Sequence, residues 1–221
     1  MGKEKNKKLI NQPHVILCEG EDATLFIIWY LEYLQKIDER FEIFQAFNFG
    51  GNEELPTLLS DIKKYPGYDD AASMIIIRDA ESNYKSAVQS VKSALANSGL
   101  PVPSEPNEIA QGDKMKVAFS LFPSLSNNER NGTLEDLCIE NLKEDNIKPL
   151  LGDINSFLLD LESKGRHFTW PHKAKIHTYF SVTDDFVSKR IGEATKAGAI
   201  NFECSEMNTL KELFIKITRS D

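Results

Sequence analysis

The stretch that most constrains the fold is His14–Asp22, which reads HVILCEGED. Its first half, Val15–Cys18, is a short unbroken apolar run that begins with β-branched residues. A run of this length indicates a strand buried on both faces, as in a parallel sheet, rather than the start of a helix. Carboxylates around a glycine end the run, and helical periodicity begins at Ala23. The pattern therefore predicts a strand that passes through a tight acidic turn into a helix.

The carboxylates Glu19 and Asp22 in this turn have two interpretations. In open α/β sheets, ligands bind outside the carboxyl ends of the strands, so these side chains are positioned for chemistry. Alternatively, they only stabilise the N-terminus of the following helix, where acidic residues are favoured. A second strand that ends in the same way favours the chemical interpretation.

That second strand is Ser73–Arg78 (SMIIIR), which is followed by Asp79 and Glu81. In extended backbone, residues two apart lie on the same face, so the two carboxylates should point together. If this strand pairs in parallel with the first one, Glu19 joins them at one edge of the sheet. Such a cluster repels itself and raises at least one pKa unless a cation binds. Because Mg²⁺ and Mn²⁺ prefer oxygen ligands, the sequence predicts a site for Mg²⁺ (or Mn²⁺) here.

A third acidic position, Glu135, lies in the first turn of a helix predicted over Leu134–Leu142. This helix follows a further predicted core strand, Lys116–Phe122. Thr133 and Asp136 match a capping box loosely, with Asp where Glu or Gln is preferred. Glu135 is therefore either a further carboxylate of the cluster or an ordinary first-turn helix charge.

The remaining pattern predicts an α/β fold with a central, mostly parallel sheet of about four strands. We expect a mobile lead-in over 1–12, a core over 13–142, and a helical C-terminal extension over 143–221 that packs on the core. The stretch Leu100–Asp113 has three prolines and should be an irregular loop. The other expected elements are an edge strand at Phe41–Phe47 and helices at Asp22–Ile37, Asn52–Lys64, Asn83–Asn97, Ile154–Leu161, Ala174–Phe180, Phe186–Thr195 and Leu210–Thr218.

The net charge of -8 counts against a protein that coats nucleic acid through a broad basic face. It does not exclude a local basic patch, and one segment is rich in cations and histidines. This segment is either a phosphate-binding surface or a solvated helix face. Its members are Lys164, Arg166, His167, His172, Lys173, Lys175, His177, Lys189, Arg190 and Lys196.

Several classes of protein are disfavoured by motifs that are missing. The N-terminal stretch has no apolar signal region, and no run of about 18 apolar residues predicts a membrane span. The three cysteines are widely spaced and form neither a zinc pattern nor a disulfide framework, which suits a reducing cytosol. Phosphate-loop, dinucleotide-binding and nucleophile-elbow motifs are also missing. We therefore expect a cytoplasmic protein.

Together, Val15–Asp22 and Ile75–Glu81 resemble the Toprim domain, which topoisomerases, primases, overcoming-lysogenization-defect (OLD) nucleases and small ribosomal-RNA-maturing nucleases share. The segments Phe122-Pro123, Gly132–Leu137 and Lys173–Tyr179 resemble a stand-alone prokaryotic Toprim-domain family of uncharacterised proteins related to the OLD branch. The resemblance covers nearly the whole chain and implies a Toprim-like, Rossmannoid three-layer fold.

Two departures from the Toprim pattern matter. The second motif ends in Glu rather than the commoner Asp, and no tyrosine-nucleophile domain or zinc-binding module accompanies it, which argues against topoisomerase or full primase activity.

The resemblance also implies roles for the acidic residues. Glu19 would act in acid–base or metal chemistry, and Asp79 and Glu81 would bind Mg²⁺, with Glu135 and Asp22 as further carboxylates. The leading hypothesis is a Mg²⁺-dependent phosphodiesterase, a nuclease-type hydrolase of DNA or RNA. Cationic candidates for catalysis or for contact with the nucleic-acid phosphates are Lys173, Lys175, His177, Lys189 and Arg190.

The alternative hypothesis is a non-catalytic Toprim module that binds a metal or nucleotide and regulates or scaffolds a partner. That partner would be a second copy of the chain or a protein of a defence or repair system. A third interpretation is that the acidic strand ends are helix caps alone. The position of the basic segment discriminates between the first two. A segment on the same side as the carboxylates favours the enzyme, and one on the opposite side favours the module.

Overall fold

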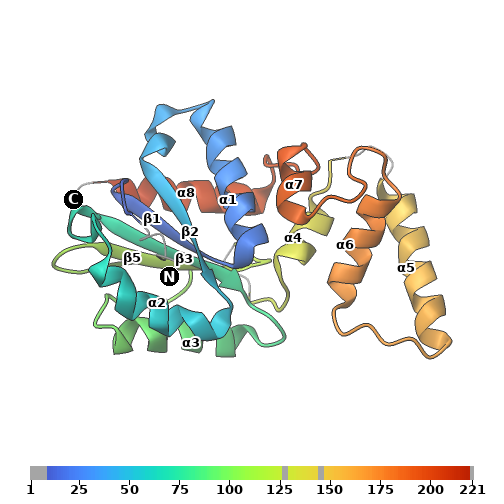
Figure 1. The fold of residues 1–221 in the computed structure, drawn as a ribbon, viewed down its shortest axis with the longest axis horizontal. Helices are drawn as coiled ribbons and strands as arrows, with labels where there is room; N and C mark the ends of the chain where they lie inside the picture. The colour runs from blue at the N-terminus through green and yellow to red at the C-terminus, as the bar shows by residue number, and fades with distance from the viewer. Residues whose placement is uncertain (1–8, 126–128, 144–146, 220–221) are drawn as a thin grey trace, which may run out of the picture.

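A computed structural model describes residues 9–125, 129–143 and 147–219 as an α/β fold with a mostly parallel central sheet flanked by helices (Figure 1). The sheet has five strands in the order β2-β1-β3-β5-β4. Its strands are β1 (His14–Glu19), β2 (Phe44–Gly50), β3 (Ser73–Asp79), β4 (Ile109–Gln111) and β5 (Lys116–Phe122). All neighbouring strands pair in parallel except β4, which pairs antiparallel with β5.

Strand β1 lies inside the sheet, between β2 and β3. Ile16 is aligned with Ala46 on one side and with Ile75 on the other. The residues from Val15 to Cys18 are all at most 1% exposed, because helices cover both faces. The prediction of a buried parallel strand is confirmed, and so is the adjacency of the two strands that carry the acidic motifs. Strand β2 is at an edge, as expected.

The alternation of side chains along the strands divides the core into two layers around the sheet. Ile16, Ile75 and Ile77 face the layer that contains α1 and α8. Leu17 and Ile76 face the opposite layer, which contains α2 and α3 (Figure 1). The helices of these layers are α1 (Gly20–Gln35), α2 (Leu55–Asp61), α3 (Tyr84–Asn97) and α8 (Ser205–Thr218).

The other helices extend the molecule beyond the carboxyl ends of the parallel strands. Helix α7 packs on α1, whereas α5 and α6 pack on each other and lie beyond α4 (Figure 1). None of the helices in the described part of the chain is long and apolar enough to cross a membrane. These four helices are α4 (Leu134–Glu140), α5 (Ile147–Ser163), α6 (Pro171–Ser181) and α7 (Ile191–Lys196).

Three expectations about the elements are wrong. The predicted loop Leu100–Asp113 contains β4, a strand of three residues that is too short to give a periodic pattern. The predicted helix Asn52–Lys64 is α2 flanked by 3₁₀ turns at 52–54 and 62–64, with a proline in its first turn. Of Phe186–Thr195, only the part from Ile191 is α-helical, since Ser188 adopts a left-handed backbone with a φ of 64°.

The two ends of the chain are more closely packed than the sequence suggested. Residues 1–8 of the predicted lead-in lie outside the described residues. Ile10, in the remainder, is 4% exposed, and its N–H donates to the Pro66 carbonyl. At the other end, α8 places Leu210 and Phe214 in the same hydrophobic cluster as strands β1 and β3. The last helix is therefore a layer of the α/β core.

This position of α8 makes a stability prediction with a matched pair of phenylalanines. Phe214 in α8 is 0% exposed and packs on Phe44, whereas Phe157 in α5 is 53% exposed. Phe214→Ala should lower the free energy of unfolding by about 3–5 kcal/mol, because a cavity opens in the core. Phe157→Ala should change it by less than about 0.5 kcal/mol. Urea denaturation measures both, and equal losses would contradict the assignment of α8 to the core.

Candidate functional site

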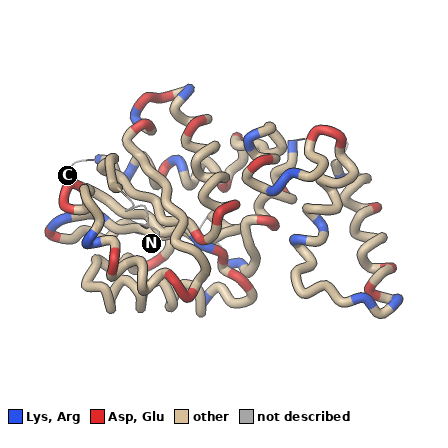
Figure 2. The backbone as a smooth tube through the Cα atoms, in the orientation of Figure 1, with Lys and Arg blue, Asp and Glu red and all other residues tan. Residues whose placement is uncertain are grey.

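The parallel pairing of β1 and β3 brings Glu19 and Asp79 to the same edge of the sheet. Cys18 is aligned with Ile77, so both strands end at about the same level. The backbone N–H of Asp79 donates to Oε2 of Glu19 at 3.3 Å. Acidic positions are visible at this end of the sheet, and basic positions lie on the segments around α6 and α7 (Figure 2). The predicted convergence of these two carboxylates is confirmed.

Arg78 provides a buried positive charge beside Glu19. Its side chain is 2% exposed, and its Nε lies 3.3 Å from Oε2 of Glu19. Its Nη1 donates to Oδ1 of Asn52 at 2.5 Å, so Asn52 fixes the position of the arginine. Burial raises the pKa of Glu19, and the positive charge of Arg78 offsets only part of that rise. Sequence reasoning missed Arg78, although a charged residue directly after three isoleucines in a buried strand was a usable signal.

Asp79 connects the end of β3 to the start of α4. Its Oδ1 accepts a hydrogen bond of 2.9 Å from the N–H of Leu134, the first residue of α4. Burial raises the pKa of Asp79 well above its usual range, and the nearby charge of Glu135 raises it further. The charges of Glu19 and Glu81 act in the same direction. Asp79 is therefore the carboxylate on which the repulsion within the cluster concentrates.

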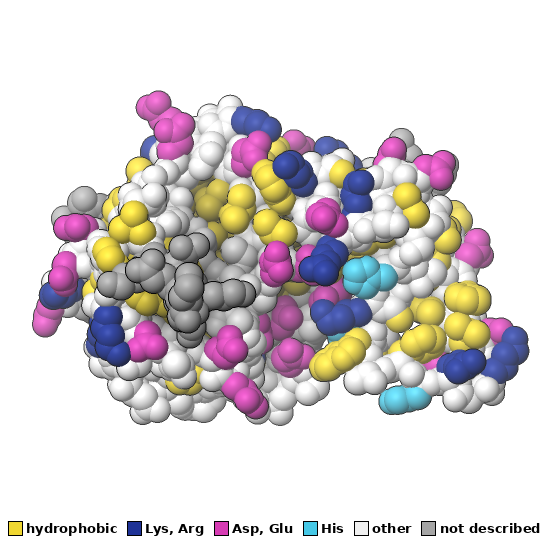
Figure 3. Space-filling view, viewed as in Figure 1, with side chains coloured by type: hydrophobic (Ala, Val, Ile, Leu, Met, Phe, Trp, Pro, Cys, Tyr) yellow, Lys and Arg dark blue, Asp and Glu magenta, His cyan; other side chains and the backbone are white. Residues whose placement is uncertain are grey.

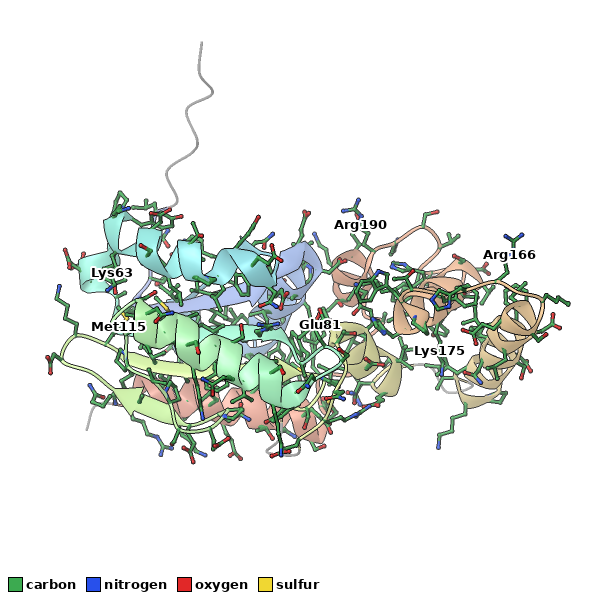
Figure 4. The ribbon with its side chains drawn as sticks, turned by 90° about the horizontal axis from the view of Figure 1, so that it is seen from below. Lys63, Glu81, Met115, Arg166, Lys175 and Arg190 are labelled. Carbon is green, nitrogen blue, oxygen red and sulfur yellow. The ribbon has the colours of Figure 1, made fainter. Side chains whose placement is uncertain are left out.

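Glu81 joins the cluster by a different route from the one predicted. It lies beyond the end of β3, and its backbone is left-handed with a φ of 57°. Its N–H and C=O both pair with Gly132 at 2.8 Å, which ties this segment to the loop before α4. Figure 4 shows Glu81 beside the end of the sheet, next to α4. The argument from extended backbone was wrong, although the charge of Glu81 still acts on Asp79 and Glu19.

Glu135 is a buried carboxylate with one oxygen paired and one unpaired. The residue is 4% exposed, and its Oε1 forms an ion pair with Nζ of Lys173 from α6. Its Oε2 is buried and has no hydrogen-bond partner among the described residues. Burial raises the pKa of Glu135, but the hydrogen bonds from Lys173 and Thr133 and the positive charge of Lys173 together outweigh this effect and lower the pKa. An unpaired buried carboxylate oxygen is costly, so this atom marks a place where a cation or a donor would be stabilised.

Asp22 also lies at this edge, but its described contact is structural. Its Oδ1 accepts a hydrogen bond of 3.1 Å from the N–H of Gly192, the second residue of α7. It therefore anchors the first turn of α7 to the first turn of α1. The charge of Asp22 contributes to the raised pKa of Lys173, after the larger effects of Glu135 and Asp79. Asp22 is thus a neighbour of the cluster and a helix anchor together.

The predicted basic segment divides into separate regions. Lys173 is the member that contacts the carboxylates. Lys175 lines a hollow of about 490 Å³ between α4, α5 and α6. In Figure 4, Lys175 lies farther from the sheet than Glu81 does. Lys189 borders α1, and Arg190 points outward from the loop before α7 (Figure 4). His177 is exposed on α6. The phosphate-contact candidates therefore do not form one patch.

The carboxylate oxygens of the cluster are the kind of ligand that a hard divalent cation prefers. Within the described ranges, no group of three or more His, Cys, Asp or Glu side chains is close enough to hold a metal ion as the side chains stand. The cluster nevertheless offers only carboxylate oxygens, including two groups with raised pKa and one buried oxygen without a partner. Oxygen-only donors of this kind suit Mg²⁺ or Mn²⁺ better than zinc or iron. The ammonium of Lys173 supplies part of the positive charge that the cluster needs.

The raised pKa of Asp79 predicts how pH affects stability. Because folding raises this pKa, the folded protein binds the proton more tightly, and the stability of the wild type falls as pH rises from about 4 through the folded-state pKa. Asp79→Asn removes the titration and keeps the acceptor for the Leu134 N–H. The variant should be more stable than the wild type at about pH 7, and the two should converge near about pH 4. Urea denaturation across this range tests it, with the exposed Asp61→Asn as control. A stability difference that does not change with pH would contradict it.

Comparisons with known proteins identify the family of the chain. No curated protein matches it, and no solved structure matches it. Residues 13–219 match the family described as "Protein of unknown function (DUF3226)". This match covers all five strands and every α-helix of the described structure. The chain therefore belongs to the DUF3226 family of proteins of unknown function.

Proposed function

We propose that the protein is a Mg²⁺-dependent, Toprim-type phosphodiesterase that acts on DNA or RNA. The observation that carries the proposal is Asp79, a partly buried carboxylate with a raised pKa that lies between Glu19 and Glu135 at the carboxyl end of the sheet. The folded protein keeps this electrostatically unfavourable cluster although isosteric amides would remove the repulsion. Such a cost is typical of a site that binds a cation or performs chemistry. The Toprim resemblance is supported by the adjacency of the two strands that carry its motifs.

The residues have distinct roles in this proposal. Asp79, Glu81 and Glu135 would hold the metal, which would supply an activated water molecule and neutralise charge on the phosphate. Glu19 has a raised pKa, so it is suited to accept and return a proton, and Arg78 fixes its carboxylate. Lys173, held over the cluster by Glu135, neutralises the charge of the phosphate oxygens.

The alternative is a non-catalytic module that binds a metal or nucleotide and scaffolds a partner. The observation that favours it is the dispersal of the basic segment, because only Lys173 contacts the carboxylates among its described residues. Large apolar side chains are also exposed on and beside α5 and α6, including Phe157 and Trp170, which are 53% and 51% exposed. Metal binding without cleavage of any nucleic acid would select this alternative.

Metal binding tests the proposal first. Mn²⁺ should raise the unfolding temperature of the wild type, with a larger rise when a short oligonucleotide supplies phosphate oxygens to the coordination shell. In Asp79→Asn this rise should disappear, and the rate of any Mn²⁺-dependent cleavage should fall at least a hundredfold. Asp61→Asn, an exposed carboxylate on α2, should retain both. No thermal shift in the wild type, with or without oligonucleotide, would reject a metal site here.

Two lysines of α6 separate the role of Lys173 from that of a general basic surface. Lys173→Met should reduce cleavage by about a hundredfold, because the phosphate loses a positioned charge. It should not weaken Mn²⁺ binding, since Glu135 loses a competing cation. Lys175→Met, whose side chain lines a different hollow, should retain cleavage within about threefold. Cleavage rates and Mn²⁺ titrations of both variants provide the test, and equal losses of cleavage would contradict a specific role for Lys173.

A further inference from the structure

Two hollows lie along α1 and share Trp29 and Lys196 in their linings. One, of about 760 Å³, lies between α1 and the α7 segment and includes Leu25, Lys189 and Gly192 in its lining. The other, of about 380 Å³, lies between α1 and the chain around Phe202. The two hollows are therefore neighbours along the helix, with the Trp29 ring and the Lys196 side chain between them.

The hollows begin close to the carboxylate cluster. Asp22, Leu25, Trp29, Tyr33 and Lys36 are spaced three or four residues apart, so they form one stripe on α1. Asp22 begins the stripe and holds Gly192 of α7, which also lines the first hollow. At 1.5 Å per residue, the stripe from Asp22 to Lys36 covers about 21 Å. A ligand in these hollows would therefore extend away from the cluster along α1.

The linings combine cations with aromatic rings. Lys143, Lys189 and Lys196 make no ion pair within the part of the chain that the structure describes. Glu193 and Glu203 also line the hollows, where they accept hydrogen bonds from the N–H of Arg190 at 2.9 Å and from the hydroxyl of Tyr33 at 3.3 Å. Dark blue, yellow and magenta side chains lie close together over α1 and α7 in Figure 3. Lys36 and Glu32 also line the second hollow and pair with each other, so the two linings together have four lysines and three glutamates, a small surplus of positive charge in a chain of net charge -8.

The aromatic rings are arranged in a way that suits planar ligands. Nζ of Lys196 lies 4.5 Å from the centroid of the Trp29 ring. In the next hollow, the ring centroids of Tyr33 and Phe202 are 5.5 Å apart and the ring planes are tilted by 50°, so each ring offers its own face to a base. The indole Nε1 of Trp29 has no hydrogen-bond partner among the described residues, so no hydrogen bond fixes the ring. A base that stacks on Trp29 would replace the Lys196 ammonium and leave it beside a phosphate.

We propose that these hollows form a track for single-stranded nucleic acid that leads from the carboxylate cluster along α1. Bases stack on Trp29, Tyr33 and Phe202, and phosphates contact Lys143, Lys189 and Lys196. Aromatic platforms beside lysines are the features that bind a single strand, whereas the bases of a duplex are stacked inside it and cannot reach these rings. The inference rests on the proposed function and names its substrate class.

Tryptophan fluorescence tests the track without catalysis. The chain has two tryptophans, Trp29 and Trp170, so Trp170→Phe leaves Trp29 as the reporter. In this background, with Asp79→Asn and EDTA to prevent cleavage, a short oligothymidylate should quench the Trp29 emission. The same sequence annealed to its complement, and thymidine monophosphate alone, should bind at least tenfold more weakly. Equal binding of the duplex would overturn the track, and equal binding of the mononucleotide would replace it with a single-nucleotide pocket.

Variants then assign the contacts, with binding of a labelled oligonucleotide followed by anisotropy. Trp29→Leu should weaken binding roughly tenfold or more, because stacking is lost, whereas Trp29→Phe should recover most of it. Lys189→Ala with Lys196→Ala should reduce the salt slope of the binding constant by about 1 to 1.5, since two phosphate contacts are lost. Trp170→Leu and Lys85→Ala, at other surfaces, are the matched controls. Equal losses in the controls would overturn the assignment.

These binding measurements separate the track from the proposed function. Single-strand binding that depends on Trp29, in a protein that never cleaves, would keep the track and reject the phosphodiesterase. Cleavage of duplex with no dependence on Trp29 would keep the phosphodiesterase and reject the track. Circular dichroism of each variant excludes loss of folding as the cause of weaker binding.

Discussion

The parallel pairing of β1 with β3 is the constraint on which the candidate site depends. It fixes the ends of the two strands at one level, so that Glu19 and the backbone of Asp79 are in direct contact. Asp79 then holds the N-terminus of α4 through Leu134, and α4 carries Glu135. One strand pairing thus positions carboxylates that are more than a hundred residues apart in the chain. Because the sheet is buried and closely packed, the placement of Glu19 relative to Asp79 does not depend on loops, whereas that of Glu135 also depends on the pairing of Glu81 with Gly132 before α4.

The positive charges of Arg78 and Lys173 determine how much of the repulsion among the carboxylates remains. Arg78 lies behind Glu19, in the layer of α2 and α3, and its hydrogen bond to Asn52 fixes it there. Lys173 comes from α6, outside the sheet layers, and its ammonium contacts Glu135. The two differ in exposure: the Arg78 side chain is 2% exposed and that of Lys173 is 47% exposed. A metal ion would therefore compete with Lys173 for the cluster, while Arg78 would remain as a permanent counter-charge.

The sequence predicted the parts of the fold that depend on local patterns. Apolar runs identified β1, β3 and β5, because burial on both faces requires them. The edge strand β2 was predicted from alternation at Phe41–Phe47, but it lies at Phe44–Gly50 because Glu39–Ile43 form a 3₁₀ turn. The short strand β4, the broken helix around α2 and the left-handed backbone of Glu81 were missed or wrong, because each depends on tertiary contacts. In the site, strand-end carboxylates were predictable from topology. The Arg78–Glu19 and Lys173–Glu135 pairs were not, since no local pattern specifies which cation reaches which carboxylate.

The net charge of -8 at first favours a protein that avoids nucleic acid, but its distribution matters more than its sum. At physiological ionic strength, charges farther apart than about 8 Å are largely screened from each other. A phosphate near α1 therefore interacts with Lys189 and Lys196, which line the hollow there, more than with acidic residues elsewhere. The carboxylates at the other end of the stripe would repel a phosphate that reached them unless a divalent cation neutralised their charge. A metal ion is therefore needed where the strand enters the cluster, whereas binding of the strand to the lysines along α1 does not depend on it.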